Sequence, residues 1–559
     1  MGDRARGRGA LGAVLIALLT GALILPASAA AAPTPLASIG STGSGAGQLS
    51  APEGVALDGS SNIYVAEFGN DRISVFSPAG AFIHAFGVDV LPPNGGSGFE
   101  VCTTGTGCLA GDSGAGAGQL ANPHGVALDG LGNLYVVDQA NHRISVFDVT
   151  VPSFTRAFGF GVDTGSTTTF EVCNTTTLCQ AGVAGGGAGQ LDVPAWVVID
   201  GSGNLYVSEL NNDRISVFNP ATPSFTRAFG WDVAEPDGDV AFEVCPTQGA
   251  CQAGDVGGFG GQLSGPNGLT LDGAGNLYVA EQVNNRISVF NPATPSFTRA
   301  FGWDVAAPNG DMAFEVCPTQ GACLQGDAGG GAGQLDDAEG VALDGAGNLY
   351  VGELPNDRIS VFNATVPSFT HAFGFDVVPP DDGSGFEVCT AGTGCLTADG
   401  GGAAGQLNSP RGVATDCRGA AWVADSLNNR IQRFGEPGTP LPPCPAAAGP
   451  AVPAAPSNAF TLGELKGKKL SLTLDSAGTV GVTDAAQASG ASAIAAAKKR
   501  LKPSSATGGP GIIEVTLKLT KAAKQKLREE GKIKVNARIT FTPTGGTANS
   551  QTAKLKIKK

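Results

Sequence analysis

The chain has 559 residues, of which 85 are glycine, and it carries a formal net charge of −15. Because glycine loses the most backbone freedom on ordering, this composition argues against long helices and predicts many short strands joined by turns. The acidic balance argues against nucleic acid as a partner, since that binding depends on neutralising phosphates.

Residues 1–30 have the pattern of a cleaved secretory signal peptide. Three arginines precede an apolar run over residues 11–25, and small residues follow in PASAA. The run is shorter than the roughly 20 apolar residues that a spanning helix needs, and no later segment qualifies. We therefore predict a secreted, extracellular protein without a transmembrane segment.

A pattern of 71 or 72 residues occurs six times between Leu36 and Phe434. Each repeat contains GVALD, a Gly/Ser-rich turn, NLYV, NxRISVF and FTRAFG, or close variants of these. Alternating or apolar runs separated by turn residues predict four antiparallel strands per repeat. Six such repeats predict an all-β, six-bladed propeller over residues 36–434, with small sheets set around a channel.

Five of the six junctions between repeats carry an insertion of about 30 residues with two cysteines. The insertions span residues 88–117, 160–188, 231–260, 303–332 and 375–404. An even set of cysteines in an exported chain favours disulfides over thiolate metal sites. The predicted pairs are Cys102 with Cys108, Cys173 with Cys179, Cys245 with Cys251, Cys317 with Cys323, Cys389 with Cys395 and Cys417 with Cys444.

The sixth junction has no insertion, and the sixth repeat has only three strands before the chain leaves it. The segment LASIG, over residues 36–40, matches the missing outer strand in position and pattern. We predict that this N-terminal strand closes the ring, which also removes an open sheet edge.

The C-terminal part differs in composition from the repeats. A Pro/Ala-rich linker is predicted over 435–457, and strands with one helix from Lys521 to Glu530 over 458–559. This last region resembles the small Ig-like β-sandwich modules of exported bacterial proteins. It has 19 basic and 6 acidic residues from Ser457 onward, against 12 and 42 between Ala30 and Pro456. It is either a contact for an anionic envelope polymer or a solvated basic face.

The motif [DE]-x-x-N-x-R-I occurs in phase in all six repeats, and through it the chain resembles the NHL-repeat propellers. A carboxylate five residues before an arginine can fix the intervening turn by a charged hydrogen bond, with the asparagine in a left-handed backbone. Because every repeat has the motif, we predict a structural role for its arginines. These are Arg72, Arg143, Arg214, Arg286, Arg358 and Arg430.

Positions that differ between repeats are candidates for ligand binding. The residue at the entry to the innermost strand is different in most repeats, and we expect this set to ring the channel mouth. The set is Glu53, His124, Ala195, Asn267, Glu339 and Arg411. Beside it, Trp196 replaces a glycine found in the other five repeats, either as an aromatic wall for a ligand or as a plug next to the small Ala195.

We predict an exported, non-catalytic, monomeric propeller without a cofactor that recognises a protein or glycan through one loop-decorated face. The insertions are alternatively a shield for the ring. Related six-bladed propellers imply two enzymatic alternatives. A calcium-dependent lactonase or hydrolase would use oxygens of Glu53, Asn267 and Glu339, although Arg411 adds an unwanted charge. A zinc lyase would need about three converging histidines, and only His124 is suitably placed.

Overall fold

The computed structural model of the chain describes residues 32–436 and 459–559. Short gaps fall at 94, 97, 164–167, 176, 236–240, 247–250, 309, 311, 381–384, 475–477, 485–499, 509–510 and 544–548. The predicted signal peptide, nearly all of the predicted linker and Cys444 lie outside the described residues. In the described part of the chain, no helix has the length and apolar character needed to cross a membrane.

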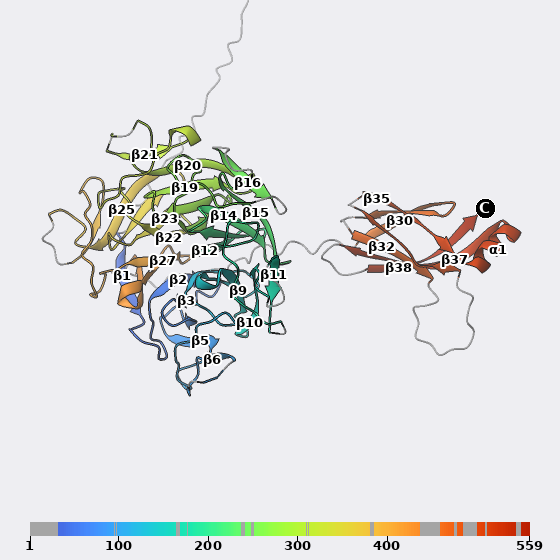
Figure 1. The fold of residues 1–559 in the computed structure, drawn as a ribbon, viewed down its shortest axis with the longest axis horizontal. Helices are drawn as coiled ribbons and strands as arrows, with labels where there is room; N and C mark the ends of the chain where they lie inside the picture. Colours follow the sequence, from blue (N-terminus) through green and yellow to red (C-terminus); the bar gives the residue numbers. More distant parts are fainter. Residues whose placement is uncertain are drawn as a thin grey trace, which may run out of the picture.

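Six antiparallel sheets form a closed ring, which confirms the predicted six-bladed propeller (Figure 1). Each innermost strand contacts the innermost strands of the blades before and after it, and the sixth contacts the first. The innermost strands are β2 (Pro52–Leu57), β7 (Pro123–Leu128), β12 (Pro194–Ile199), β17 (Pro266–Leu271), β22 (Ala338–Leu343) and β27 (Pro410–Thr415).

The second and third strands of each blade form the most deeply buried hairpin. The second strands are β3 (Ile63–Glu67), β8 (Asn133–Asp138), β13 (Leu205–Glu209), β18 (Leu277–Glu281), β23 (Asn348–Glu353) and β28 (Ala421–Asp425). The third strands are β4 (Arg72–Phe76), β9 (Arg143–Asp148), β14 (Arg214–Asn219), β19 (Arg286–Asn291), β24 (Arg358–Asn363) and β29 (Arg430–Gly435). Their near-continuous apolar character follows from burial on both faces, between neighbouring blades.

Five blades have one strand more than the four that the repeat predicts. The fourth strands are β5 (Phe82–Val88), β10 (Ser153–Phe160), β15 (Ser224–Trp231), β20 (Ser296–Trp303) and β25 (Ser368–Phe375). The fifth strands are β6 (Phe99–Cys102), β11 (Phe170–Cys173), β16 (Phe242–Pro246), β21 (Phe314–Cys317) and β26 (Phe386–Cys389). The segment FEVC of each insertion therefore extends the sheet outward and does not remain a loop.

The N-terminal strand closes the ring as predicted. β1 (Thr34–Ile39) pairs antiparallel with β29 as the fourth strand of blade six, with Thr34 opposite Gly435 and Ile39 opposite Ile431. In Figure 1 the blue β1 accordingly lies beside the orange strands of the last blade. Ile39 is 7% exposed and packs with Val55 of blade one and Trp422 of blade six. This strand therefore joins the first and last blades through one core.

The repeated arginine holds each blade together at the turn between its second and third strands. In blade one, Arg72 donates from Nε to Glu67 at 2.8 Å and from both Nη atoms to four backbone carbonyls, including Leu109 of the insertion. Asn70 donates its amide to Glu67, and the left-handed residue is its neighbour Asp71 (φ 48°). The structural role is thus as predicted, while the left-handed backbone lies one residue later than expected.

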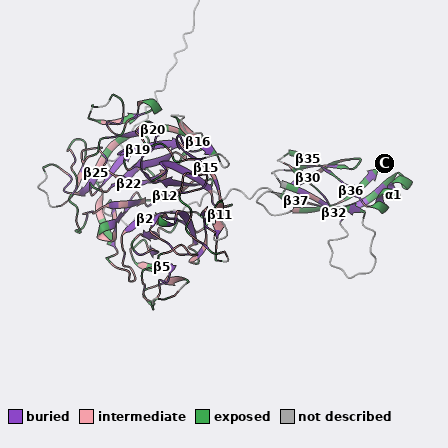
Figure 2. Cartoon of the chain, in the orientation of Figure 1, coloured by how far each residue is buried: buried purple, intermediate pink, exposed green. Residues whose placement is uncertain are grey.

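The phenylalanine of each FEVC segment packs against the next blade. Figure 2 shows how much of the strands of the ring is buried (purple). Phe99 lies 5.9 Å from Phe86 of its own blade and 5.8 Å from Phe147 of blade two, measured between ring centroids. The same trio recurs at the next four junctions.

A disulfide closes each insertion, which confirms all five pairs predicted there. The first cysteine ends or nearly ends the fifth strand, and its partner follows six residues later. All ten of these cysteines are buried. The pairs are Cys102 with Cys108, Cys173 with Cys179, Cys245 with Cys251, Cys317 with Cys323 and Cys389 with Cys395. Cys417 is also disulfide-bonded. Its pairing with Cys444 stays a prediction, because Cys444 is not among the described residues.

Residues 460–558 form a β-sandwich around a separate apolar core. One sheet contains β30 (Phe460–Lys466), β31 (Lys469–Leu474) and β35 (Gly511–Thr516). The other contains β34 (Ser504–Gly508), β32 (Gly478–Asp484), β37 (Lys532–Pro543) and β38 (Asn549–Lys558), and a short ribbon pairs β33 (Leu501–Lys502) with β36 (Lys518–Leu519). Helix α1 (Lys521–Glu530) has the predicted bounds; the Thr520 side chain caps it, and it ends at the left-handed Gly531.

Candidate functional site

Side chains from all six blades meet near the propeller axis, and we call this set the axial cluster. Its members are Glu53, His124, Trp196, Asn267, Glu339 and Arg411. We expected these residues to ring an open channel mouth. Instead, the first five are each at most 4% exposed, and only Arg411 keeps 31% of its side chain accessible. They are buried because the innermost strands converge here and the side chains fill the axis between them.

Glycine normally follows the variable position, because the innermost strands approach each other closely at that point. A Cβ at Gly268 or Gly340 would collide with the carbonyl oxygen of the next blade. In blade three, where Trp196 replaces this glycine, the hydroxyl of Ser208 bridges the two strands. It accepts from Trp196 N at 2.9 Å and donates to Asn267 O at 2.6 Å.

Trp196 reaches across the axis from blade three. Its indole meets the ring of His124 edge-on, with centroids 5.7 Å apart. The far end of the indole lies against the backbone of Gly412 in blade six, where a Cβ would be only 3.2 Å from Cη2 of Trp196. At 4% exposure the indole offers little surface to a ligand, so the geometry favours the plug over the aromatic wall.

One arginine lies against two buried carboxyl groups in the axial cluster. Nη1 of Arg411 lies 3.2 Å from Glu53 and 3.4 Å from Glu339. Burial nevertheless raises the pKa of Glu53 to about 8 and that of Glu339 to about 7, with Arg411 opposing the shift in both. Burial therefore favours the protonated, uncharged form of both carboxyl groups.

His124 presents an unprotonated nitrogen to Glu53. Its Nδ1 donates to the carbonyl of Ala195 at 2.9 Å, so Nε2 is the free acceptor of the neutral ring. Burial lowers the pKa of His124 to about 3, and Nε2 lies 3.8 Å from Oε2 of Glu53. A lone pair facing a carboxylate is stable only with a proton or a cation between them, which agrees with a protonated Glu53.

The donor set also suits a divalent cation. Ligand atoms of Glu53, His124 and Glu339 all lie within 4.8 Å of one another. Oδ1 of Asn267 is buried and has no hydrogen-bond partner among the described residues. Carboxylate, amide and imidazole donors are ordinary ligands for such ions. Arg411 supplies a positive charge at this place, and its guanidinium would repel a cation held by the same carboxyl groups.

We expect Glu53→Gln to change the pH dependence of stability. The folded-state pKa of Glu53 lies above its unfolded value of 4.5, so the folded form retains a proton that the unfolded form releases. The free energy of unfolding of the wild type therefore decreases as the pH rises from about 4.5 to about 8. The variant does not show this decrease, because glutamine does not titrate. Its free energy of unfolding relative to that of the wild type should rise by about 4 kcal/mol from pH 5 to pH 9 in chemical denaturation. The exposed Glu235→Gln is the control, and parallel pH profiles for Glu53→Gln and wild type would contradict the assignment.

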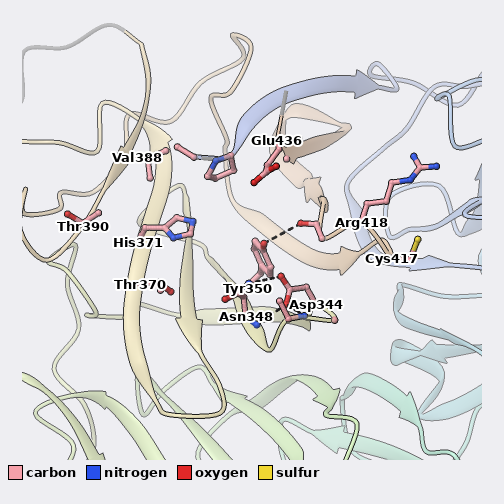
Figure 3. Close-up of a pocket in the computed structure, with 16 residues that line it drawn as sticks. Asp344, Asn348, Tyr350, Thr370, His371, Val388, Thr390, Cys417, Arg418 and Glu436 are labelled. Atoms are coloured by element: carbon pink, nitrogen blue, oxygen red, sulfur yellow. Dashed lines mark hydrogen bonds between the residues drawn. The ribbon is translucent and has the colours of Figure 1, made fainter. Parts of the chain in front are cut away.

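A cavity of about 760 Å³ lies between blades five and six (Figure 3). Its walls include Asp344, Tyr350, His371, Thr390 and Glu436. Figure 3 shows the imidazole of His371 and the phenol of Tyr350 facing this space, with Tyr350 donating to Gly419 O. Burial lowers the pKa of His371 to about 4, and its Nε2 has no partner among the described residues. A neutral imidazole here can accept a hydrogen bond from a hydroxyl group.

This seam cavity exists because blade six lacks the hairpin between its third and fourth strands. The corresponding space between blades two and three is about 270 Å³. There Arg156 donates to the carbonyl of Pro220 in the hairpin turn, at 2.9 Å. At the seam His371 stands in the place of that arginine, and the chain enters and leaves the blade where the turn would be. Sequence analysis missed the cavity, although the absent hairpin was its signal.

Sequence analysis also missed an exposed apolar patch at blade four, which we call the blade-four patch: Val256, Phe259 and Val283. They are 63%, 50% and 54% exposed. The backbone of Gln325 adjoins Gly258, and its side chain donates to Val283 O, so Gln325 links the segment of Phe259 to the turn that carries Val283. Phe259 also lies 6.0 Å from the ring of Trp231. The patch is on the face that carries the turns between second and third strands.

The position of Phe259 has a structural equivalent in every blade. Its backbone N–H donates to the side chain of Gln262, and the same bond starts from Gly45, Gly116, Gly187, Gly331 and Ala403 in the other blades. Only blade four has a large side chain there. This departure from the repeat was the signal that sequence analysis could have used.

The NHL repeat family model matches residues 120–147 and 407–434, in blades two and six. The chain therefore contains NHL repeats, as the motif predicted. The chain is similar to the crystal structure of virginiamycin B lyase from Staphylococcus aureus, with 12% identity over 71% of this chain and 99% of that chain and a TM-score of 0.37. It is also similar to an auxiliary nutrient binding protein from Bacteroides thetaiotaomicron, with 11% identity over 72% and 76% of the chains and a TM-score of 0.38.

Proposed function

We propose that this NHL-repeat propeller is an exported, monomeric binding protein that recognises a protein or glycan through the blade-four patch and the insertions around it. The observation that carries the proposal is the half-exposed Phe259 at a position where the other five blades have glycine or alanine. A solvent-exposed aromatic side chain that no structural equivalent needs is typical of a binding surface.

The rest of the propeller supports a binding role for this face. The insertions are tied to the ring by a fifth strand, a disulfide and the repeated arginine, so the loops on this face are held on a rigid scaffold. Rigid loops lose little conformational entropy on binding. The five disulfides indicate an oxidising environment, which agrees with export.

We expect Phe259→Gly to weaken ligand binding by about tenfold or more, because a central aromatic side chain commonly dominates an interface. Glycine restores what most blades have at this position, so the melting temperature should stay near that of the wild type. Arrays of glycans and of secreted proteins, followed by titration of each hit, provide the measurement.

Leu131→Ala is the matched control. Leu131 is 65% exposed in the turn between the first and second strands of blade two, at the other end of the strands from the patch. It should leave binding unchanged. Ligand binding that survives Phe259→Gly but is lost in Leu131→Ala would place the recognition surface on the opposite face and overturn the proposal.

A second candidate is a divalent-cation-dependent hydrolase of the lactonase type, which the donor set of the axial cluster favours. Glu53, Glu339, Asn267 and His124 would hold the ion, which would polarise a carbonyl oxygen as a Lewis acid. Arg411, as the accessible member, would contact the substrate. The Glu53→Gln variant also tests this candidate: calcium-stimulated hydrolysis of lactones or phosphoesters supports it only if the variant loses the turnover and the calcium-induced rise in melting temperature.

A further inference from the structure

The outer face of the ribbon β37–β38 in the C-terminal sandwich carries a dense set of cations, which we call the basic ladder. Its members are Lys532, Lys534, Arg538, Lys554, Lys556 and Lys558, all exposed. The alternate residues of both strands, such as Ile533, Val535 and Ile557, point into the core. The period of two therefore places every cation of this ribbon on one face.

Two pairs of lysines stand directly opposite each other. Lys532 is paired with Lys558, and Lys534 with Lys556. Like charges in directly opposed positions destabilise a sheet. Within the described residues, no carboxylate lies within 4.0 Å of any ladder cation, whereas Lys466, Lys469 and Lys526 elsewhere in the sandwich each have an acidic partner. The ladder is thus a local charge excess that the fold itself does not neutralise.

Lysines on an edge strand also discourage pairing with other chains, and β38 is an edge. That role does not account for the cations of β37, which lies inside the sheet. A second strand of cations, in register with the first, adds repulsion without protecting an edge. Binding of a negatively charged ligand accounts for the cations on both β37 and β38.

We propose that the basic ladder binds a linear polymer of phosphodiesters that carries no bases, such as an anionic polymer of the cell envelope. Same-face residues repeat about every 6.8 Å along a strand, and opposed residues lie about 5 Å apart, so the ladder is two parallel rows of charge. An extended polyanion can follow such rows, whereas a small anion meets one pair. Five of the six cations are lysines, which bind phosphate as compact point charges.

The chemistry of the face separates this polymer from nucleic acid. The remaining outward positions of the ribbon are Asn536, Thr540, Thr542, Ser550 and Thr552. Asn536 is paired with Lys554, Arg538 with Thr552 and Thr540 with Ser550. Single-stranded nucleic acids gain much of their affinity by stacking bases on aromatic side chains. The described outer face of the ribbon offers no aromatic side chain, so the phosphate backbone is the only part of such a chain that it would recognise.

The test uses the full-length protein and poly(glycerol phosphate), measured by fluorescence anisotropy over a range of salt concentrations. The triple variant Lys534→Gln/Lys556→Gln/Lys558→Gln should bind at least about tenfold more weakly at low salt, and its log–log salt slope should fall by about 2. The control Lys518→Gln/Lys521→Gln/Lys524→Gln removes the same charge from exposed positions outside the ladder. It should weaken binding less than about threefold.

If the two triple variants lose the same affinity for poly(glycerol phosphate), the effect depends only on net charge, and the proposed role of the basic ladder is wrong. Tighter binding of oligothymidylate than of poly(glycerol phosphate) at equal charge would overturn the choice of polymer. The ladder triple should keep or raise the melting temperature, because it removes opposed like charges. If the ladder triple variant unfolds, polymer binding is measured instead with the single variant Lys556→Gln on the edge strand. Binding equal to that of the wild type in this variant would also contradict the proposal.

Discussion

Deletion of residues 34–39 is expected to destabilise the propeller by more than about 5 kcal/mol. The deletion removes the backbone pairing of β1 with β29 and leaves the third strand of blade six as an open edge. It also removes Ile39 from the core that joins blades one and six, and loss of one buried isoleucine alone costs about 2–5 kcal/mol. Thermal unfolding followed by circular dichroism gives the measurement.

Two point variants separate ring closure from simple shortening of the chain. Ile39→Asp places a charge in the seam between blades one and six, and it should reproduce most of the loss. Ser38→Asp changes the exposed neighbouring residue of the same strand and should unfold close to the wild type. A deletion that unfolds like the parent chain would reject closure of the ring by this strand.

Replacing Arg286 by alanine is expected to cost about 3–5 kcal/mol, because the change leaves Glu281 charged in a buried site. Arg286 is 0% exposed, and its Nη atoms donate to the carbonyls of Gly258, Phe259, Gln262 and Leu324. The free energy of unfolding from denaturant titration provides the measurement.

Arg430 is the matched control from the same motif. Blade six has no insertion, so Arg430 lacks the carbonyl that Leu324 supplies to Arg286, and its side chain is 13% exposed. Arg430→Ala should cost about 1 kcal/mol less than Arg286→Ala, because it breaks one hydrogen bond fewer. The pair Arg286→Met with Glu281→Leu should recover part of the stability lost in Arg286→Ala, since both charges are then gone. Equal losses in the two alanine variants would show that the contact with the insertion contributes nothing.

The repeat made most of the propeller predictable from the sequence. Turn residues and alternating apolar runs marked the strands, and the motif around Arg72 marked the same turn in all six blades. The count of five insertions against six repeats indicated that Leu36–Ile39 completes the last blade. The fifth strand was missed because FEVC is too short to be distinguished from a loop by its pattern. Only its pairing with the fourth strand, as between Phe99 and Val88, makes it a strand.

The candidate sites were less predictable, for a different reason. The repeats identified the six variable positions at the axis, but spacing along the chain does not report how far the innermost strands converge. Burial of Glu53 and His124, and the path of Trp196 to blade six, depend on that convergence. Phe259 was missed because the repeats were not compared at the position of Phe259 itself, which lies in the loop before the innermost strand.

The sequence by itself determined the six blades, the closing strand, the disulfide pairs within the insertions and the separate basic module, because each depends on residues at fixed spacings along the chain. The tertiary structure alone decided that the axial residues are buried, that the seam holds a cavity, and that lysines oppose lysines on one ribbon. These properties depend on distances between residues far apart in the chain, and burial and register set those distances only after the sheets have formed.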